Sequence, residues 1–503
     1  MDEVIIVGAG PVGLMLACEL ALAGVRPTVL DERPEPSDLP KANGLMGQIV
    51  RMLDYRGLLE RFAEGSPFAG RPPGFPFGSV PLRFAGLDGI PLRMVMVQQP
   101  RMERLLAERA AELGVEIVRG TPVLGLTQDD DGVTLDLPGR RLRAHSAVGC
   151  DGAHSLVRKQ LGISFHGTTD DEALLLGHFR TDQATGLFEQ SRVMGLEQGW
   201  NHRPHGRLLL TSLRPGVDIV GVREKGAAGP VTLAGFQAAI RRVIGADLPL
   251  GEPIWLSSTV AQARLAERYR SGRVFLAGDA AHLFPAGGSA LNVGLMDAVN
   301  LGWKLAAVLT GRAPIRLLDT YETERRPVGE RTLAHTRAQA ALERLTGVEG
   351  TALRDLLAGV FAFEQPARHL AHLLHGSDTR YGIPSEGAGE GMVAGEPGGG
   401  VVTAGAAGGR GVVGADLIGR LAPDLHLTTG DGHTRVAELM RDGRPLLLDL
   451  GGDATIGGDW IRVVRARCDD PPADTLLIRP DGQVAWTGTA GLREAAAEWL
   501  QPA

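Results

Sequence analysis

The amino-acid sequence predicts an α/β protein, with a Rossmann-like dinucleotide-binding domain, an inserted β-rich domain and a small C-terminal α/β domain. Three observations support this prediction. The chain opens with a strand, a glycine-rich turn, a helix and a second strand. A β-rich pattern occupies about residues 165–260, and a glycine-rich segment precedes the last 90 or so residues. The length of 503 residues is also too great for a single hydrophobic core.

The N-terminal unit is the most clearly patterned part of the chain. Residues 4–7 are a continuous apolar run, as expected for a buried parallel strand, and Gly8 ends it. Residues 11–23 are expected to form a helix that Gly24 closes, because glycine favours the left-handed conformation found after helix ends. Residues 26–30 are a second strand, which ends in Asp31. Together these segments predict one βαβ unit.

The remaining pattern divides the chain into four parts. We expect residues 1–164 and 262–385 to form the nucleotide-binding domain, 165–261 the β-rich domain, 386–414 a flexible linker and 415–503 the C-terminal domain. Helices are expected at residues 44–59, 101–113, 292–309 and 317–342. Short strands are expected at 115–119, 132–137, 147–150, 274–277, 445–450, 461–466 and 475–478, the last followed by a hairpin turn at 480–482.

Composition excludes several classes of protein. The net charge of −7 comes without a basic cluster, which argues against a nucleic-acid partner. No apolar run reaches about 18 residues and the N-terminus is acidic, so neither a membrane span nor a signal peptide is expected. The three cysteines form no CxxC pair, which argues against disulfides and zinc and favours a cytoplasmic location.

The turn after the first strand has the spacing of a dinucleotide-binding fingerprint. Gly8 permits the tight turn, Gly10 lets the backbone approach a pyrophosphate, and Gly13 permits close packing of helix on strand. The helix N-terminus offers amide groups and positive dipole to the phosphates. Asp31 can accept hydrogen bonds from a ribose, and Val12 and Glu32 belong to the same candidate site. This fingerprint alone does not distinguish NAD from FAD.

Two later segments carry a resemblance to a known family. Residues 148–158, VGCDGAHSLVR, resemble the strand–DG–helix motif of flavoprotein aromatic hydroxylases, and residues 278–282, GDAAH, resemble their GD motif. The chain thus resembles the single-component FAD-dependent family typified by para-hydroxybenzoate hydroxylase. Residues 302–305, GWKL, and the C-terminal part are closer to its branch of actinomycete polyketide oxygenases and rifampicin monooxygenase. In that branch the last domain is thioredoxin-like.

The resemblance implies roles for individual residues. Asp279 would hold the FAD ribityl chain, with a helix N-cap as the alternative role, and His282 is expected to be a packed core histidine. Gln99 and Lys41 match residues near the FAD diphosphate and adenosine, with ordinary surface roles as the alternative. The flavin loop would contribute Pro285, Gly288, Leu291 and Asn292, because free amides at a helix start stabilise negative charge. Asp151, with Arg158, would meet a transiently bound NADPH or NADH.

The chain departs from the family at two places. Gln48 stands where relatives carry arginine, and Arg51 follows one helical turn later on the same face. Arg51 is therefore the candidate catalytic cation, with a solvent-exposed role as the alternative. In the flavin loop Ser289-Ala290 replaces the usual Gln-Gly, which leaves the loop geometry after Pro285 open. A nearby guanidinium favours an anionic oxygen donor, so Arg51 keeps both aromatic hydroxylation and Baeyer–Villiger insertion open.

The resulting hypothesis is an FAD- and NAD(P)H-dependent monooxygenase that inserts one oxygen of O2 into a polycyclic aromatic, polyketide-type substrate. Hydroxylation is preferred over Baeyer–Villiger lactone formation on the family's base rate. The alternative of another class is a non-catalytic FAD- or substrate-binding protein. Trp200, His202 and Phe188 are candidates for lining the substrate site, with packing as their alternative role. The C-terminal domain lacks CxxC and is expected to be structural or to make a homodimer contact.

Overall fold

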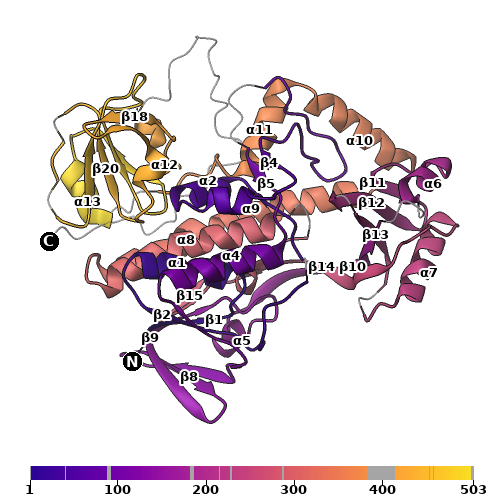
Figure 1. Ribbon diagram of the computed structural model, residues 1–503, viewed down its shortest axis with the longest axis horizontal. Helices are drawn as coiled ribbons and strands as arrows, with labels where there is room; N and C mark the ends of the chain where they lie inside the picture. The colour runs from indigo at the N-terminus through magenta and orange to yellow at the C-terminus, as the bar shows by residue number, and fades with distance from the viewer. Residues whose placement is uncertain are drawn as a thin grey trace.

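The computed structural model describes residues 2–39, 41–87, 92–181, 186–214, 216–226, 229–285, 288–382, 414–452, 454–456 and 458–499. The glycine-rich linker expected at 386–414 lies outside these residues except for Gly414. Figure 1 shows three bodies of structure, with the C-terminal domain and the inserted sheet at opposite ends of the molecule and long helices between them. This arrangement confirms the predicted α/β fold class.

The nucleotide-binding domain is built on an eight-stranded sheet of order β15-β16-β9-β1-β2-β6, with β7 and β8 branching from β9. Strands β1 (Asp2–Val7), β2 (Pro27–Leu30), β6 (Glu116–Val118), β9 (Arg140–Gly149) and β16 (Val274–Leu276) run parallel to their neighbours. The edge strand β15 (Arg270–Ser271) and the β7 (Gly125–Gln128)–β8 (Val133–Leu137) hairpin are antiparallel. The predicted βαβ unit is therefore confirmed.

Three helices cover one face of this sheet. Helix α1 (Pro11–Leu22) packs against both α4 (Gln99–Glu112) and α8 (Ser289–Leu309). Gly302 allows the close approach of α8, because a Cβ atom there would lie 2.6 Å from the Glu19 Cβ of α1. The inner positions of β1 are buried on both sides, which explains its continuous apolar run.

The helix expected over residues 44–59 is present but shorter than predicted, at residues 48–55. The structure has a two-residue strand β3 (Leu45–Met46), then α2 (Gln48–Tyr55) and α3 (Leu59–Ala63). Gly47 separates strand from helix with φ of 85°, and a Cβ atom there would lie 2.9 Å from the His375 carbonyl oxygen. Gly57, also in the left-handed region, separates the two helices. Strand β3 pairs with β5 (Met94–Val95), which also pairs with β4 (Ala69–Gly70).

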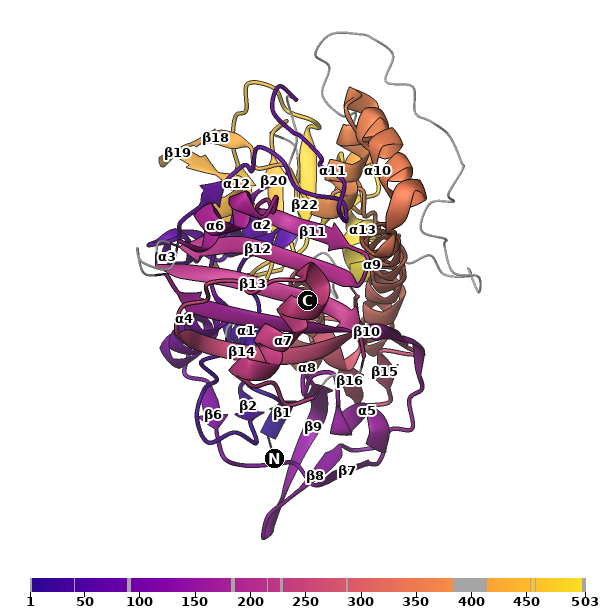
Figure 2. The same cartoon turned by 90° about the vertical axis from the view of Figure 1, so that its right-hand side faces the viewer.

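The inserted segment forms a six-stranded antiparallel sheet of order β11-β12-β13-β10-β14-β17. Its strands are β10 (Phe165–Arg180), β11 (Gly199–Arg203), β12 (Gly206–Arg214), β13 (Val217–Lys225), β14 (Pro253–Ala266) and β17 (His282–Leu283). Helix α7 (Leu233–Ile244) covers its outer face, as Figure 2 shows, and shares a hydrophobic core with it to which α6 (Leu187–Val193) contributes. Strand β17 extends this sheet directly from the GD segment.

The rest of the chain completes the long helices and the C-terminal domain. A 3₁₀ turn (Ile315–Leu318) leads into α9 (Asp319–Arg344), followed by α10 (Gly347–Phe361) and α11 (Glu364–His375). The last domain holds a four-stranded sheet, β21 (Arg462–Arg465), β20 (Leu446–Asp449), β22 (Thr475–Ile478) and β23 (Val484–Thr487), in that order. Around it lie a 3₁₀ turn (Gly414–Leu417), a hairpin of β18 (His426–Thr429) and β19 (Gly432–Arg435), α12 (Val436–Leu439) and α13 (Leu492–Trp499).

A buried network of charged side chains joins the C-terminal domain to α8 and α9. Arg479 donates to both oxygens of Glu324, at 2.7 and 2.8 Å, and also pairs with Asp481. Lys304 donates to Glu324 at 2.7 Å, and Asn300 bridges Glu324 and Asp481. All five side chains are buried. The C-terminal domain is therefore packed against the nucleotide-binding domain rather than tethered beside it.

Among the described residues, no helix combines the length and apolar character needed to cross a membrane. In the same ranges, no group of three His, Cys, Asp or Glu side chains is arranged to hold a metal ion.

Candidate functional site

Four segments that are distant in sequence meet at one edge of the eight-stranded sheet. They follow the carboxyl ends of β1, β2, β9 and β16, which are adjacent and parallel, and comprise Gly8–Gly10, Asp31, Asp151 and Asp279. Backbone hydrogen bonds between neighbouring strand ends fix this meeting, with the Cys150 amide 2.8 Å from the Val7 carbonyl and the Ala277 amide 3.0 Å from the Gly149 carbonyl. Ligands of open α/β sheets bind at this edge.

The three fingerprint glycines have different surroundings. A Cβ atom at Gly8, where φ is 106°, would lie 2.4 Å from the Cys150 carbonyl oxygen. A Cβ atom at Gly13 would lie 2.0 Å from the Gly8 carbonyl oxygen. At Gly10 a Cβ atom would meet nothing within 4 Å. Gly8 and Gly13 are thus required by packing, whereas Gly10 leaves its backbone open to an approaching group.

Asp31 is tied to the glycine turn. Its Oδ2 atom accepts a hydrogen bond from the Ala9 amide at 2.7 Å, and its Oδ1 atom accepts one from the Arg33 amide at 2.9 Å. The side chain is buried, while that of Glu32 is exposed. Asp31 therefore stands where a ribose carried by the turn would lie, and its carboxylate oxygens keep further lone pairs for hydroxyl donors. The ribose role of Asp31 and Glu32 stays a prediction.

Asp279 is accessible to solvent although protein surrounds it closely. Its side chain is exposed, and yet burial by the neighbouring atoms raises the pKa of its carboxyl, against the opposing charges of His282 and Lys41. The exposure and the raised pKa are both expected for a carboxylate that protein atoms surround on most sides and solvent reaches on one. Asp279 lies inside a short 3₁₀ turn (Gly278–Ala280) whose N-cap residue is Ala277, so Asp279 does not occupy the N-cap position of that turn. Exposed Lys41 contributes positive charge to the same place.

A residue not anticipated from the sequence holds the Asp279 turn in position. Asp297 of α8 is fully buried and accepts hydrogen bonds from the Gly278 amide at 3.1 Å, from His282 Nε2 at 2.7 Å and from Arg325 Nε at 2.7 Å. Burial acts to raise the pKa of Asp297, but the charges of Arg325 and His282 outweigh it and lower the value. His282 is thus the packed histidine that was expected. The sequence feature that could have identified Asp297 is an acidic residue within the mostly apolar helix α8.

Val12 links the fingerprint to the Asp279 turn. A Cβ atom at Gly278 would lie 2.9 Å from Val12 Cγ2, and one at Gly294 of α8 would lie 2.9 Å from the Gly278 Cα. The helix start, the Asp279 turn and α8 therefore approach each other as closely as backbone allows. This packing gives Val12 a structural role in the site.

The DG segment supplies one unpaired acceptor and one buried cation. Asp151 Oδ2 accepts from the Val157 amide at 3.0 Å, while Asp151 Oδ1 is buried with no hydrogen-bond partner among the described residues. Arg158 donates to the Ala280 carbonyl at 2.8 Å and lies 3.8 Å over the Phe165 ring. Arg158 thus holds the Asp279 turn in place through the Ala280 carbonyl. The contribution of Asp151 to nicotinamide binding stays a prediction.

The start of α8 faces the same region. Gly288 adopts the left-handed conformation before the helix, and no side chain caps the helix there. Asn292 Oδ1 accepts from the Met46 amide at 2.9 Å, and Asn292 Nδ2 donates to the Gly288 carbonyl at 3.0 Å. The Leu291 amide precedes the first possible hydrogen bond within the helix and is available to a ligand. Pro285 is half-buried, and the following loop residues 286–287 lie outside the described residues.

Gln99 and Gln48 both bond to protein atoms. Gln99 Nε2 donates to Glu103 Oε1 at 2.8 Å, while Glu103 Oε2 is buried with no partner among the described residues. Burial raises the pKa of Glu103, against hydrogen bonding from Gln99 and nearby positive charge that includes Lys41. Gln48 Nε2 donates to the Gly376 carbonyl at 2.7 Å, so it anchors the end of α11.

Arg51 reaches toward the C-terminal domain. Its Nη1 atom donates to the Ala422 carbonyl at 3.0 Å, and the Tyr55 hydroxyl donates to the same oxygen at 3.0 Å. Arg51 is half-buried, which differs from the solvent-exposed alternative, and its charge contributes to the low pKa of His375. The guanidinium therefore makes an interdomain contact, and a catalytic role for Arg51 stays a prediction.

The candidate substrate-lining residues separate onto the two faces of the inserted sheet. Phe188 packs into the outer core with α7, so it lies away from the nucleotide-binding domain. Trp200 and His202 alternate with buried Asn201 on β11 and lie on the other face. Trp200 stacks near Arg207 and Arg223, and His202 Nε2 is 2.9 Å from the Glu343 carbonyl of α9. Of the three, only Trp200 and His202 remain candidates.

The residues at the sheet edge fit FAD. The open backbone at Gly10 and the uncapped start of α1 suit a pyrophosphate. The acceptors Asp31, Asp151 Oδ1 and accessible Asp279 suit the hydroxyl groups of a ribose and a ribityl chain. A second strand–glycine loop–helix unit is not present in the described residues. The fold and site together define a single-fingerprint flavoprotein.

Comparison with known proteins agrees with this assignment. Residues 1–336 match the family model described as "FAD binding domain", and residues 415–503 match "Aromatic-ring hydroxylase, C-terminal". The chain belongs to the FAD-dependent aromatic-ring hydroxylase family, and it is a flavin-dependent monooxygenase.

Relatives of similar length include enzymes of tetracycline and rifampicin chemistry. The 12-dehydrotetracycline 5-monooxygenase/anhydrotetracycline 6-monooxygenase of Streptomyces rimosus subsp. rimosus is 38% identical, with 99% of each chain covered. The rifampicin monooxygenase of Streptomyces venezuelae is 40% identical over 97% of this chain and 96% of its own. The anhydrotetracycline hydroxylase structure from Streptomyces rimosus matches with a TM-score of 0.84 and 38% identity over 99% of both chains.

Proposed function

We propose that this enzyme uses NADPH or NADH to hydroxylate a polycyclic aromatic substrate of the polyketide type in secondary metabolism. The observation that carries the proposal is the convergence of Gly10, Asp31, Asp151 and Asp279 at one sheet edge, facing the start of α8. The activities named for the tetracycline and rifampicin relatives support the substrate class. An aromatic hydroxylase of angucycline biosynthesis, which matches with a TM-score of 0.85 and 36% identity over at least 99% of both chains, supports it further.

In this proposal the protein binds and orients the reactants. Bound FAD supplies the redox chemistry, because it accepts two electrons from the nicotinamide nucleotide and delivers them to O2. Asp279 orients the ribityl chain, and the Leu291 amide at the start of α8 places positive dipole where negative charge accumulates. Asp297 is a positioning residue, since it fixes the Gly278 amide and therefore the direction of Asp279.

A cavity of about 300 Å³ lies between the flavin loop and the inserted sheet. Its lining includes Pro285 and residues of β10, β14 and α9, namely Thr168, Thr169, Asp170, Asp171, Ala261, Ala263, Arg337 and Arg344. The proximity of Pro285 makes this cavity the proposed approach of the substrate to the flavin. Thr168, Thr169 and Arg337 offer hydrogen-bonding groups to the phenol and carbonyl oxygens of a polycyclic aromatic compound.

The test is anaerobic reduction of the FAD-loaded protein by NADPH and, separately, NADH, followed by an O2 pulse with a panel of polycyclic phenols and ketones. A new ring hydroxyl, identified by mass and NMR, is the expected product. A lactone from a ketone would replace hydroxylation by Baeyer–Villiger insertion and make Arg51 the first residue to substitute. Absence of reduction by either nucleotide contradicts the proposed electron donor.

One relative motivates a control without O2. The dialkyldecalin synthase of Streptomyces rugosporus is 35% identical over 100% of this chain and 99% of its own, and its name denotes no oxygenation. Each substrate is therefore also incubated with oxidised enzyme under anaerobic conditions. A product that forms there to the same extent as in the O2 pulse arises without oxygen transfer and counts against hydroxylation.

A further inference from the structure

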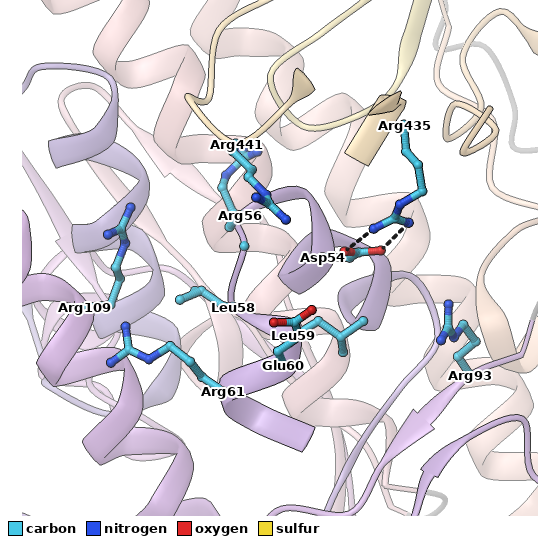
Figure 3. A pocket seen from close by; sticks show the side chains of 11 residues that line it. Asp54, Arg56, Leu58, Leu59, Glu60, Arg61, Arg93, Arg109, Arg435 and Arg441 are labelled. Carbon is cyan, nitrogen blue, oxygen red and sulfur yellow. Dashed lines mark hydrogen bonds and ion pairs between the residues drawn. The ribbon is translucent and has the colours of Figure 1, made fainter. Parts of the chain in front are cut away.

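A cavity of about 500 Å³ lies away from the FAD site, at the junction of the nucleotide-binding and C-terminal domains. It is bordered by the connection between α2 and α3, by α4, by the residue before β5 and by residues flanking α12. Figure 3 shows arginine side chains from all these elements around one space. The lining consists of Asp54, Arg56, Gly57, Leu58, Leu59, Glu60, Arg61, Arg93, Arg109, Arg435 and Arg441.

The cavity is separate from the nucleotide fingerprint. Arg56 in its wall pairs with Glu19, which stands near the end of α1, whereas the fingerprint turn precedes Pro11 at the start of that helix. The eight residues between them correspond to about 12 Å along the helix axis at 1.5 Å per residue. The wall of this cavity therefore contacts α1, through Arg56 and Glu19, near the end of the helix opposite to the fingerprint turn.

Four of the six arginines in the lining are already paired with carboxylates. Arg56 is buried and bidentate to Glu19, at 2.7 Å for each contact. Arg435 bonds to Asp54 at 3.1 Å through each terminal nitrogen. Arg61 and Arg109 share Glu112, at 2.7 and 2.9 Å. These four guanidinium groups are therefore oriented by carboxylates of the protein.

The other two arginines have no such partner. Arg93 and Arg441 are exposed, and in the described part of the chain their guanidinium groups make no hydrogen bond or ion pair. Arg93 belongs to the nucleotide-binding domain and Arg441 to the C-terminal domain, so the two face the cavity from opposite sides of the domain junction. Glu60 is the only acid in the described lining that makes no ion pair there. Arg435 and Arg61 each contact a second carboxylate, of Asp424 and Glu108, so the positive charge available to a ligand is confined to the Arg93 and Arg441 side chains.

The lining determines the kind of ligand. A polycyclic aromatic substrate needs apolar walls, whereas this cavity offers guanidinium groups on several sides. Guanidinium donors form paired hydrogen bonds with phosphate oxygens, and their geometry favours phosphate over a monovalent ion. The volume of about 500 Å³ is within the range of small-molecule sites. The matching ligand is a small molecule that carries two or more phosphate charges.

We propose that this cavity binds a phosphate-bearing anion, either inorganic pyrophosphate or the diphosphate of a nucleotide, between Arg93 and Arg441. Bound there, the anion joins the two domains through two guanidinium groups that make no ion pair among the described residues. Its binding therefore stabilises the domain junction by mass action, in proportion to the logarithm of ligand concentration above the dissociation constant. Glu60 opposes binding, because its carboxylate faces the same space.

The experiment uses FAD-loaded protein, so that added nucleotides cannot enter the FAD site. Binding of inorganic pyrophosphate, ADP and adenosine is measured by calorimetry at constant ionic strength, since screening weakens all charge pairs. The variants are R93A/R441A, which removes the unpaired charges, R93K/R441K, which keeps charge and removes the planar donor pair, and E60Q. The matched control is R192A/R268A, which removes two arginines that are exposed outside this cavity.

Pyrophosphate and ADP are expected to bind and adenosine is not. R93A/R441A should weaken binding at least tenfold, R93K/R441K should weaken it less, E60Q should strengthen it, and R192A/R268A should leave it unchanged. Tighter binding of ADP than of pyrophosphate identifies a nucleotide as the source of the phosphates, and equal binding identifies the inorganic anion. Failure of both anions to bind, or equal affinity in wild type and R93A/R441A, overturns the proposal.

Discussion

Replacing Glu324 by glutamine should destabilise the domain junction strongly. Glu324 is buried and accepts from Asn300 at 2.6 Å, Lys304 at 2.7 Å and Arg479 at 2.7 and 2.8 Å. Burial would raise the pKa of Glu324, but the charges of Arg479 and Lys304 outweigh it and lower the value. Glutamine keeps the shape, loses the charge and leaves the two cations facing only Asp481. Breaking a buried pair in this way costs about 3–5 kcal/mol.

The size of the loss should depend on Lys304. Burial lowers the pKa of Lys304 to about 8, with the Glu324 charge acting in the opposite direction. Without Glu324 the pKa of Lys304 falls further below its unfolded value, and the unfolded chain then binds the extra proton. Stability of the E324Q variant should therefore rise with pH up to the unfolded pKa of lysine. In E324Q/K304M the unpaired cation is absent, so at least about 1 kcal/mol should be recovered.

Urea unfolding followed by tryptophan fluorescence is the assay. Trp303 and Trp499 report on this junction, because their rings lie 5.2 and 4.4 Å from the Arg479 guanidinium carbon. The control is E330Q on the same helix, where Glu330 is exposed and pairs only with Arg326. An E324Q variant within about 0.5 kcal/mol of wild type, as expected for the control, would refute the reasoning. So would a double variant less stable than E324Q.

Three further predictions concern the site and its surroundings. G10A should fold normally and bind FAD more weakly, because its Cβ occupies the open space left for the pyrophosphate. G13A should destabilise the FAD-free protein, because its Cβ overlaps the Gly8 carbonyl. Equal thermal midpoints for the two FAD-free variants would contradict this prediction. D279A should raise the FAD dissociation constant, measured by fluorescence, by about 10- to 100-fold, and wild-type affinity would exclude the ribityl role. Burial, with the charges of Arg51 and His372, lowers the pKa of His375 to about 3. Neutral His375 therefore contributes its full stabilisation above the unfolded histidine pKa of about 6.5, and this stabilisation is lost as pH falls toward 3. H375Q should flatten the acid limb of the plot of unfolding free energy against pH. An unchanged acid limb would show that other groups set the acid sensitivity.

Local sequence was sufficient for the nucleotide-binding unit. The apolar run before Gly8, the spacing to Gly10 and Gly13 and the acid at residue 31 are contiguous features, and their geometry follows from one strand, one turn and one helix. The strands of the C-terminal domain and the hairpin turn at 480–482 could be predicted for the same reason. Asp279 was found through family resemblance, since a GD pair alone has no distinctive spacing.

Only tertiary structure decided the features that depend on distant partners. Gly47 ends β3 because the His375 carbonyl, far along the chain, leaves no room for a side chain, and no local pattern records that contact. Arg51 is directed by the Ala422 carbonyl of another domain, so its i,i+3 relation to Gln48 could not reveal its contact. Asp297 acquires its role only when α8 packs beneath the Asp279 turn. Local periodicity encodes helices and strands, whereas hydrogen-bond partners of buried polar groups are chosen by packing between segments.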